Sequence, residues 1–248
     1  MLSHVGIVAV TSLALEARIA QGSGVSVLCH QSLRLATALK DAIARGASGV
    51  ISFGVAGGLA PKLAAGDWIV ASHVRTDTDL IATDQAWAKT LLNAIPNAIH
   101  AEIVGIDTLL DDPAEKARVH VETGAVAVDM ESHVAAKIAL EHRIPFAACR
   151  IIIDAAHRRL PPAAAVGLRP DGTPDLLAVC RSVLQNPRQL PDLIRTALDA
   201  RIAQRALRLG RKHLGAGLGF PNYNNLALTV AVNANARTAF LKSGSFAA

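Results

Sequence analysis

The sequence has 248 residues, of which 51% are hydrophobic and 18% are charged, so it is long and apolar enough to bury one sizeable α/β core. Its three cysteines, Cys29, Cys149 and Cys180, lie far apart, and the nine histidines form no HExxH-type cluster. This spacing disfavours a disulfide framework and a metal site. We therefore expect a reduced, cytoplasmic protein without a bound metal.

The net charge of +5 is concentrated in the C-terminal part of the chain. Positions 201–248 carry seven Lys or Arg and no acidic residue, which leaves 18 basic and 20 acidic residues at positions 1–200. That balance disfavours a nucleic-acid surface on the main body. No window has 18 uninterrupted apolar residues, and Glu16 and Arg18 interrupt the N-terminal apolar run, so neither a membrane span nor a signal peptide is predicted.

Short β-rich runs alternate with helical segments along the chain. The predicted strands are VGIVAV (5–10), GVISFG (49–54), DWIVASHV (67–74), EIVGI (102–106), GAVAVDM (124–130) and PFAACRIII (145–153). The predicted helices cover about 33–45, 113–122 after Asp112-Pro113, 132–142 and 175–186. This alternation predicts a single-domain, three-layer α/β/α fold with a central, mostly parallel (mixed) sheet. We expect a catalytic domain over 1–200 and a basic helix end with a tail over 201–248.

Chemically reactive side chains follow four of the predicted strands. The first strand leads to Glu16 and Arg18, and the second leads into the glycine-rich FGVAGGLAP at 53–61. The fifth ends at Asp129, Met130 and Glu131, and the sixth carries Arg150 and Asp154. Ligands of open α/β sheets bind beyond the carboxyl ends of the strands, so we predict one crevice that holds all four groups.

Each of these features also has a purely structural interpretation. The glycine-rich stretch is equally consistent with a tight β-to-α connection and with backbone N–H groups bare enough to approach an anion. Asp129 and Glu131 suit a helix N-terminus, and capping is the favoured role for Asp129. Glu16 fits a solvated turn residue, and Arg150 with Asp154 fits a structural ion pair.

The ordered blocks FGVAGGL, AVDMES and PFAACRIIID resemble the superfamily of purine nucleoside phosphorylases and methylthioadenosine/S-adenosylhomocysteine nucleosidases. The resemblance covers 5 to about 200. Within that superfamily, EARIA (16–20), AVDMESH and the segment at 160–184 are most similar to the hopanoid-associated phosphorylase group. This resemblance implies cleavage of the N-glycosidic bond of an adenine nucleoside such as adenosylhopane, in hopanoid biosynthesis. It also implies a homo-oligomer.

The resemblance implies a role for each residue of the crevice. Glu131 would accept hydrogen bonds from the ribose 2′- and 3′-hydroxyls, with Met130 packed against the sugar. Asp154 would act as the acid at purine N7. The other substrate contacts would come from Arg150, Ala56 and Gly57. An acidic Asp154 needs a raised pKa, which the apolar run before it would provide by desolvation, while Arg150 would lower that pKa if it lay close.

The group that attacks the sugar distinguishes hydrolysis from phosphorolysis. Hydrolysis needs a carboxylate to activate water, and Glu16 is the candidate. Phosphorolysis needs an anion site, for which the resemblance implies the backbone of Gly54 and Gly58 with Arg18, and Arg34 and Ser32 as weaker candidates. We predict phosphorolysis, with inorganic phosphate as co-substrate and no other cofactor; the alternative is a hydrolytic nucleosidase.

Departures from the family pattern favour further alternatives. Val55 and Ile153 stand where many relatives have serine, which is consistent with a non-catalytic nucleoside-binding module. Leu109 and Leu110 occupy the expected purine-stacking segment, which predicts aliphatic walls around the base. A dinucleotide-binding oxidoreductase is disfavoured because FGVAGGL does not match GxGxxG and follows the second strand.

The C-terminal part contains a predicted basic amphipathic helix. Most basic residues of this part fall between apolar residues that recur at three- or four-residue spacing. These apolar residues are Ile194, Leu198, Ile202, Ala206 and Leu209. Docking of this helix on the domain is the favoured interpretation. The alternatives are adsorption to an anionic membrane, which suits a lipid-linked nucleoside, and a membrane-surface scaffold without catalysis. The segment 216–248 matches no pattern.

Overall fold

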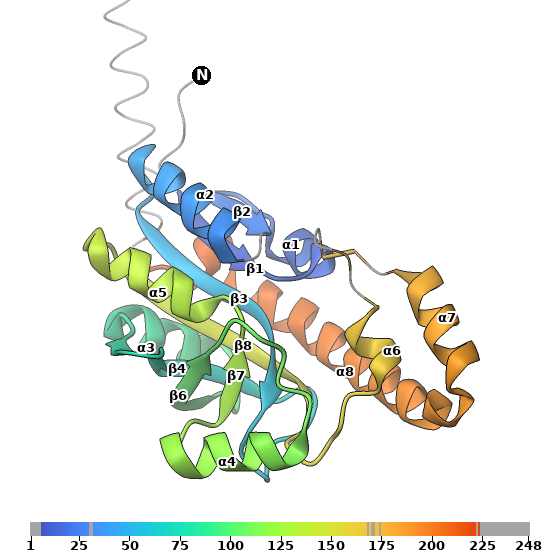
Figure 1. Cartoon of the computed structure of the whole chain (residues 1–248). Helices are drawn as coiled ribbons and strands as arrows, with labels where there is room; N and C mark the ends of the chain where they lie inside the picture. Colours follow the sequence, from blue (N-terminus) through green and yellow to red (C-terminus); the bar gives the residue numbers. More distant parts are fainter. Residues whose placement is uncertain are drawn as a thin grey trace, which may run out of the picture.

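The structure is a computed structural model that describes residues 6–29, 32–167, 169, 172–173, 175–221 and 223, without the side chains of 32, 33 and 165. Figure 1 shows strands at the centre with helices on both sides. The strands are β1 (Ile7–Thr11), β2 (Val25–Cys29), β3 (Gly49–Gly58), β4 (Trp68–Arg75), β5 (Leu80–Ala82), β6 (Ile99–Gly105), β7 (Ala127–Asp129) and β8 (Phe146–Asp154). The helices are α1 (Ala14–Ala20), α2 (Ser32–Ala44), α3 (Gln85–Ala94), α4 (Pro113–Thr123), α5 (Ser132–Glu141), α6 (Pro162–Ala165), α7 (Leu176–Gln185) and α8 (Leu190–Leu214), with short 3₁₀ turns at Pro187–Gln189 and Ala216–Gly219.

The strands form one mixed sheet whose order is β2-β1-β3-β7-β6-β4-β5. Strand β8 pairs with β3 in parallel and with β4 in antiparallel, so β3, β7, β6, β4 and β8 close into a ring. Because β1, β2, β3 and β8 run parallel, their carboxyl ends lie at the same edge. The predicted α/β fold with a mixed sheet is confirmed.

Two apolar clusters cover the two faces of the sheet. On one face, Leu35 and Leu39, one helical turn apart on α2, join the alanines of α5. On the other face, Trp87 of α3 packs with Leu207 of α8. Gly210 lets α8 approach closely, because a Cβ there would lie 2.3 Å from the Trp68 ring. Both layers are therefore anchored by side chains at helical spacing.

The predicted strands and helices are all found, with ends shifted by a few residues. The prediction of a glycine-rich turn after the second predicted strand is wrong. FGVAGG continues β3 to Gly58 instead of turning away from the sheet. Gly57 pairs with Val128 on one side and Asp154 on the other, so both edges of this segment stay hydrogen-bonded. Strands β2 and β5 and helices α1, α3 and α6 were not predicted.

Helix α8 docks on the domain, but with a different face from the predicted one. Its buried residues are Ala203, Leu207, Gly210 and Leu214. The predicted stripe is about half exposed, at Ile194 54%, Leu198 52%, Ile202 52% and Leu209 49%. The helix also runs without a break through position 200, so the docked body extends to Leu214. Most of the unassigned tail, 224–248, lies outside the described residues.

A search of the described helices for one long and apolar enough to cross a bilayer finds none.

Candidate active site

The four predicted groups meet where β1, β3 and β8 end. Glu16 lies just after β1 and contacts β3, Glu131 follows β7, and Asp154 is the last residue of β8. All three carboxyl groups are nearly buried, at 1%, 3% and 7% exposed. The structure brings these residues to the same part of the sheet, around β3; that they line one crevice stays a prediction.

Glu16 is held by the backbone of two elements. Its Oε2 accepts hydrogen bonds from the N–H groups of Ser12 (3.0 Å) and Leu13 (2.9 Å), and its Oε1 accepts one from Val55 (2.7 Å). Burial raises the pKa of Glu16, while Arg150 and these N–H groups act to lower it. A Cβ at Gly54 would lie 2.6 Å from the carboxyl group, so glycine makes room for it. Glu16 is therefore a buried carboxyl group and not a solvated turn residue.

Arg150 is fully buried and links the acidic residues to each other. Its Nε lies 2.6 Å from Asp129 Oδ2, its Nη2 lies 3.3 Å from Glu131 Oε2, and Nη2 donates to Ser52 Oγ at 2.5 Å. Burial acts to lower the pKa of Arg150, but the carboxylates of Asp129, Glu131 and Glu16 outweigh it and raise that pKa. The proposed ion pair of Arg150 with Asp154 is wrong, because these other carboxylates occupy the guanidinium. Its direct contact with substrate stays a prediction.

The Asp129 side chain accepts hydrogen bonds from the start of helix α5, as predicted, whereas Glu131, the N-cap residue itself, makes no side-chain capping bond. The Oδ1 of Asp129 accepts hydrogen bonds from the backbone N–H groups of Ser132 at 2.9 Å and Glu131 at 3.3 Å. These donors lie at the start of the helix and would otherwise lack partners. The cap and the ion pair with Arg150 together fix the turn that carries Glu131.

Glu131, predicted to bind the ribose hydroxyls, is a buried carboxyl group beside Arg150. Burial raises the pKa of Glu131 to about 7; Arg150 opposes this shift, and the carboxylates of Asp129 and Glu16 add to it. A carboxyl group that changes protonation near neutral pH both donates hydrogen bonds to hydroxyls and accepts them. Met130, predicted to pack on the sugar, is half-buried beside it.

Asp154 lies next to Gly57 and forms an ion pair with Lys116, a residue that was not predicted to belong to the site. Its Oδ2 forms an ion pair with Nζ of Lys116, which is fully buried on α4, and Nζ also donates to the carbonyl of Arg158 at 3.2 Å. Burial raises the pKa of Asp154, as predicted, and Lys116 rather than Arg150 opposes that shift. The sequence could have indicated the burial of Lys116, because it lies one helical turn before the apolar Val119, which is half-buried on the same face of α4.

Two of the predicted phosphate ligands, Gly54 and Arg18, are unfavourably placed to bind an anion together, and the phosphate site as a whole stays a prediction. The Glu16 carboxyl group covers Gly54 and takes the N–H of Val55, and a carboxylate repels a phosphate at that place. Arg18 is exposed, and residues two positions apart on a helix face nearly opposite ways, so it points away from Glu16. Arg34 is also exposed, on α2. The side chain of Ser32 lies outside the described part.

The remaining predicted contacts line β3 and the loop before α4. Ala56 is buried, and Gly57 is partly exposed and lies beside Asp154; contact of either residue with a substrate stays a prediction. Leu110 packs in the small apolar cluster with Leu59 and Val128, while Leu109 is 47% exposed. Leu110 therefore belongs to a small apolar core cluster, and its role as a wall of the purine site stays a prediction.

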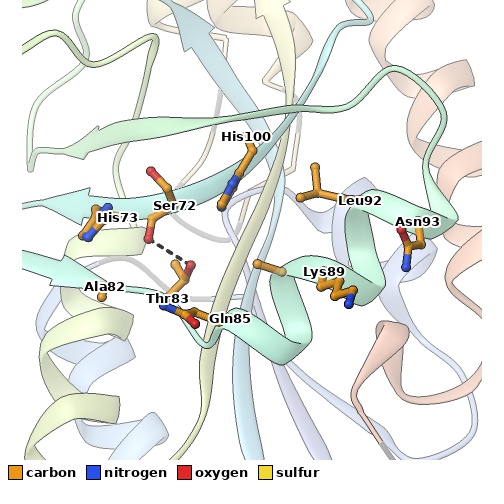
Figure 2. Close-up of a pocket in the computed structure, with 10 residues that line it drawn as sticks. Ser72, His73, Ala82, Thr83, Gln85, Lys89, Leu92, Asn93 and His100 are labelled. Carbon is orange, nitrogen blue, oxygen red and sulfur yellow. Dashed lines mark hydrogen bonds between the residues drawn. The ribbon is translucent and has the colours of Figure 1, made fainter.

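A separate pocket of about 370 Å³ lies between β4, β6 and α3 (Figure 2). Ser72, Thr83, Lys89 and His100 are among its lining residues. The neighbouring Asp84 donates its backbone N–H to the carbonyl of Phe146, the first residue of β8, so the pocket lies at the opposite end of β8 from Asp154. It contains none of the residues predicted to act on a nucleoside.

Solved structures of nucleosidases share this fold. A 5′-methylthioadenosine/S-adenosylhomocysteine nucleosidase from Helicobacter pylori, bound to butyl-thio-DADMe-Immucillin-A, aligns with a TM-score of 0.61 at 15% identity, over 84% of this chain and 95% of that one. Futalosine hydrolase of the same organism aligns with a TM-score of 0.61 at 15% identity, over 85% and 96%. A putative 5′-methylthioadenosine/S-adenosylhomocysteine nucleosidase from Francisella philomiragia gives 0.59 at 18% identity, over 85% and 96%. At these identities the likeness concerns the fold.

The comparison with curated proteins finds no match to this chain. The family model described as the phosphorylase superfamily matches residues 19–169, which is more than half of the chain and includes Glu131, Arg150 and Asp154. By this match, the chain belongs to the phosphorylase superfamily.

Proposed function

We propose that this chain cleaves the N-glycosidic bond of a purine nucleoside. The observation that carries the proposal is the pair of buried carboxyl groups, Glu131 and Asp154, whose pKa values are both raised and which lie on either side of the end of β3. Raised pKa values at a crevice are typical of groups that exchange protons or hold hydroxyls during a reaction. Membership of the phosphorylase superfamily supports the same reaction class.

The two carboxyl groups suit the two charges that develop when the bond breaks. Positive charge builds on the ribose. In this proposal Glu131, which Arg150 holds in position, binds the ribose hydroxyls and brings its own carboxylate close to that charge. Negative charge builds on the departing purine, and Asp154 in its protonated form donates to N7. In this proposal Gly57 and Ala56 form the floor between the sugar and the base.

The geometry favours water over phosphate as the attacking group. Glu16 occupies the place where phosphate was predicted to bind, and its raised pKa makes its carboxylate a stronger base for activating water. The names of the structural neighbours, nucleosidases and a hydrolase, agree with this choice. Phosphorolysis is the second candidate, supported by the sequence resemblance and by the exposed cation Arg34 near the ends of β1 and β2.

Replacement of Glu16 tests the choice of water. Glu16→Gln is expected to lower adenine release by about 100-fold or more, because the amide cannot take a proton from water. Wild-type protein is expected to release adenine and a free sugar at the same rate with and without phosphate, measured by chromatography. The exposed Glu141→Gln serves as the control and should keep the full rate.

A strict need for phosphate with a 1-phosphorylated sugar as product would contradict hydrolysis. That result would instead establish the phosphorolysis predicted from the sequence. The preferred substrate in either case is proposed to be a 5′-substituted adenosine, with adenosylhopane as the example that the sequence resemblance implies.

We further propose that the arm formed by α7 and the first half of α8 adsorbs to an anionic membrane. Figure 1 shows α6 and α7 beside α8, away from the sheet. Large apolar side chains on this arm are exposed: Leu176 71%, Leu177 74%, Leu184 81%, Ile194 54% and Leu198 52%. Arg181, Arg188, Arg195 and Arg201 are exposed on the same two helices and the turn between them. Apolar and basic residues in this combination suit a surface of anionic lipids, which would also hold a lipid-linked substrate.

Vesicle sedimentation tests the membrane proposal. The protein is expected to pellet with vesicles containing phosphatidylglycerol, to pellet less at high salt, and to stay in solution with phosphatidylcholine alone. Leu177→Glu with Leu184→Glu should abolish the binding, and Asp154→Asn should leave it unchanged. Failure to pellet, together with a dimer that Leu184→Glu dissociates, would show that a second copy covers this surface, as the predicted homo-oligomer would.

A further inference from the structure

The ion pair of Lys116 with Asp154 has no evident purpose in folding. A buried ion pair costs desolvation of both ions, and replacement by well-packed apolar residues is often neutral or stabilising. Lys116 has no exposed surface and sits where the inner face of α4 would accept an apolar side chain. A cation at this position is therefore explained better by the chemistry of its partner than by the stability of the helix.

Three charged groups surround Asp154. Lys116 approaches from α4 and contacts Oδ2 directly, Asp199 of α8 acts on Asp154 from a greater distance, and Arg158 follows β8 and pairs with Asp199 at 3.7 Å. Strand β3 presents only the backbone of Gly57 to the carboxyl group. The Arg158 guanidinium pairs with Asp199. The cation in direct contact with the Asp154 carboxyl group is therefore Lys116.

We infer that Lys116 is a positioning residue that sets how readily Asp154 releases its proton. The inference rests on the proposed function. A carboxyl group buried in apolar surroundings holds its proton tightly, which makes it a poor donor. An adjacent ammonium group stabilises the carboxylate that remains after the proton has left, and this stabilisation grows as the reaction proceeds.

The step balances with water as the only co-reactant: C1′ gains the oxygen of a water molecule as it loses the purine, and the proton of that water passes to Glu16. The bond between N9 of the purine and C1′ of the sugar breaks, and its electron pair stays with the purine. The Asp154 O–H bond breaks as an N7–H bond forms. Asp154 ends as a carboxylate that faces the ammonium group of Lys116, which keeps its own protons throughout. Solvent protonates Asp154 again before the next turnover.

Lys116→Met is expected to change the pH dependence of purine release. Asp154 acts in its protonated form, so activity is lost as the pH rises through its pKa. Lys116 lowers that pKa in the wild type, so without Lys116 the alkaline limb of kcat/KM should move upward by about 1 pH unit or more. The rate at the optimum should fall about 10-fold, because the carboxylate that forms is no longer stabilised. Lys116→Arg, which keeps the cation, should retain the wild-type limb.

A second lysine and a second variant serve as controls. Lys137→Met removes a lysine that pairs with the exposed Asp77, and it should leave the pH profile unchanged. If Lys116→Met does not fold, Lys116→Gln tests the same point, because its amide still donates to the Arg158 carbonyl while the charge is lost. Circular dichroism of each variant verifies the fold.

Carboxyl NMR separates this inference from the proposed function. Protein labelled with ¹³C at aspartate Cγ is titrated, and the Asp154 signal is identified by its absence in Asp154→Asn. In the folded variant that lacks the cation, this signal should titrate about 1 pH unit or more above the wild type. Identical titrations would overturn the role of Lys116. A shifted titration in a protein that releases no purine would contradict the proposed function while the electrostatic effect of Lys116 stood.

Discussion

Asp154→Asn is expected to lower the rate of purine release by about 10²–10⁴-fold. The amide has nearly the shape of the carboxylic acid but cannot transfer a proton to N7, so the purine would leave as an anion. The loss should appear in kcat, with a small change in KM, because the proton is transferred only as the bond breaks. Initial rates of adenine release, followed by chromatography over a range of substrate concentrations, separate the two parameters.

The fold of this variant needs a control because Lys116 loses its charged partner. Asp192→Asn changes an exposed aspartate on α8 and should keep the wild-type rate. Circular dichroism shows whether Asp154→Asn is folded. A folded variant that keeps more than about a fifth of the wild-type rate would contradict the role of Asp154 as the acid, since general acid catalysis contributes 10²-fold or more.

Arg150→Met is expected to lower the free energy of unfolding by about 3–5 kcal/mol. Arg150 is fully buried, with Asp129 and Glu131 in direct contact and Glu16 near enough to respond to its charge. Removal of the cation leaves buried carboxyl groups without a counter-charge, and two of them also lose the group that opposes the rise of their pKa. Urea denaturation measures the loss.

The loss should depend on pH in a definite direction. Without Arg150 the pKa values of Glu16 and Glu131 rise further in the folded state, so the folded variant binds more protons than the unfolded chain above the ordinary glutamate range. Its deficit relative to the wild type should therefore grow from pH 5 to pH 8. The exposed Arg18→Met should cost less than about 0.5 kcal/mol. A loss in Arg150→Met that is equally small, or the same at both pH values, would contradict the account of Arg150 as the shared counter-ion.

Periodicity was sufficient to predict most of the fold. Helix α4 begins where Asp112 and Pro113 predicted it, because Asp112 caps the free N–H groups of Ala114 and Glu115. Strand β2 was missed because it is only five residues long, and its position at the sheet edge leaves most of its residues half-buried. The closure of β3 to β8 into a ring depends on pairings between distant segments, which local pattern does not encode.

The strand ends predicted which residues would meet, but not how they would pair. Arg150 and Asp154 are four residues apart and looked like partners, yet the true partners come from elsewhere in the fold. Lys116 reaches Asp154 from 38 positions away, and Glu16 reaches Val55 from 39 positions away. Such contacts follow from the approach of Lys116 on α4 to the end of β8 and from the packing of α1 on β3, so the counter-ion of Asp154 and the place of Glu16 against Gly54 became visible only in three dimensions.

The decisive measurement is the release of adenine from a 5′-alkyl adenosine by the purified wild-type protein. We expect stoichiometric adenine and sugar at a rate that Asp154→Asn reduces by at least about 100-fold. Binding of the same nucleoside, measured by calorimetry, accompanies the rate. A nucleoside that binds without any release of adenine, in phosphate-free and phosphate-containing buffer alike, would contradict catalysis and would identify the chain as a nucleoside-binding module.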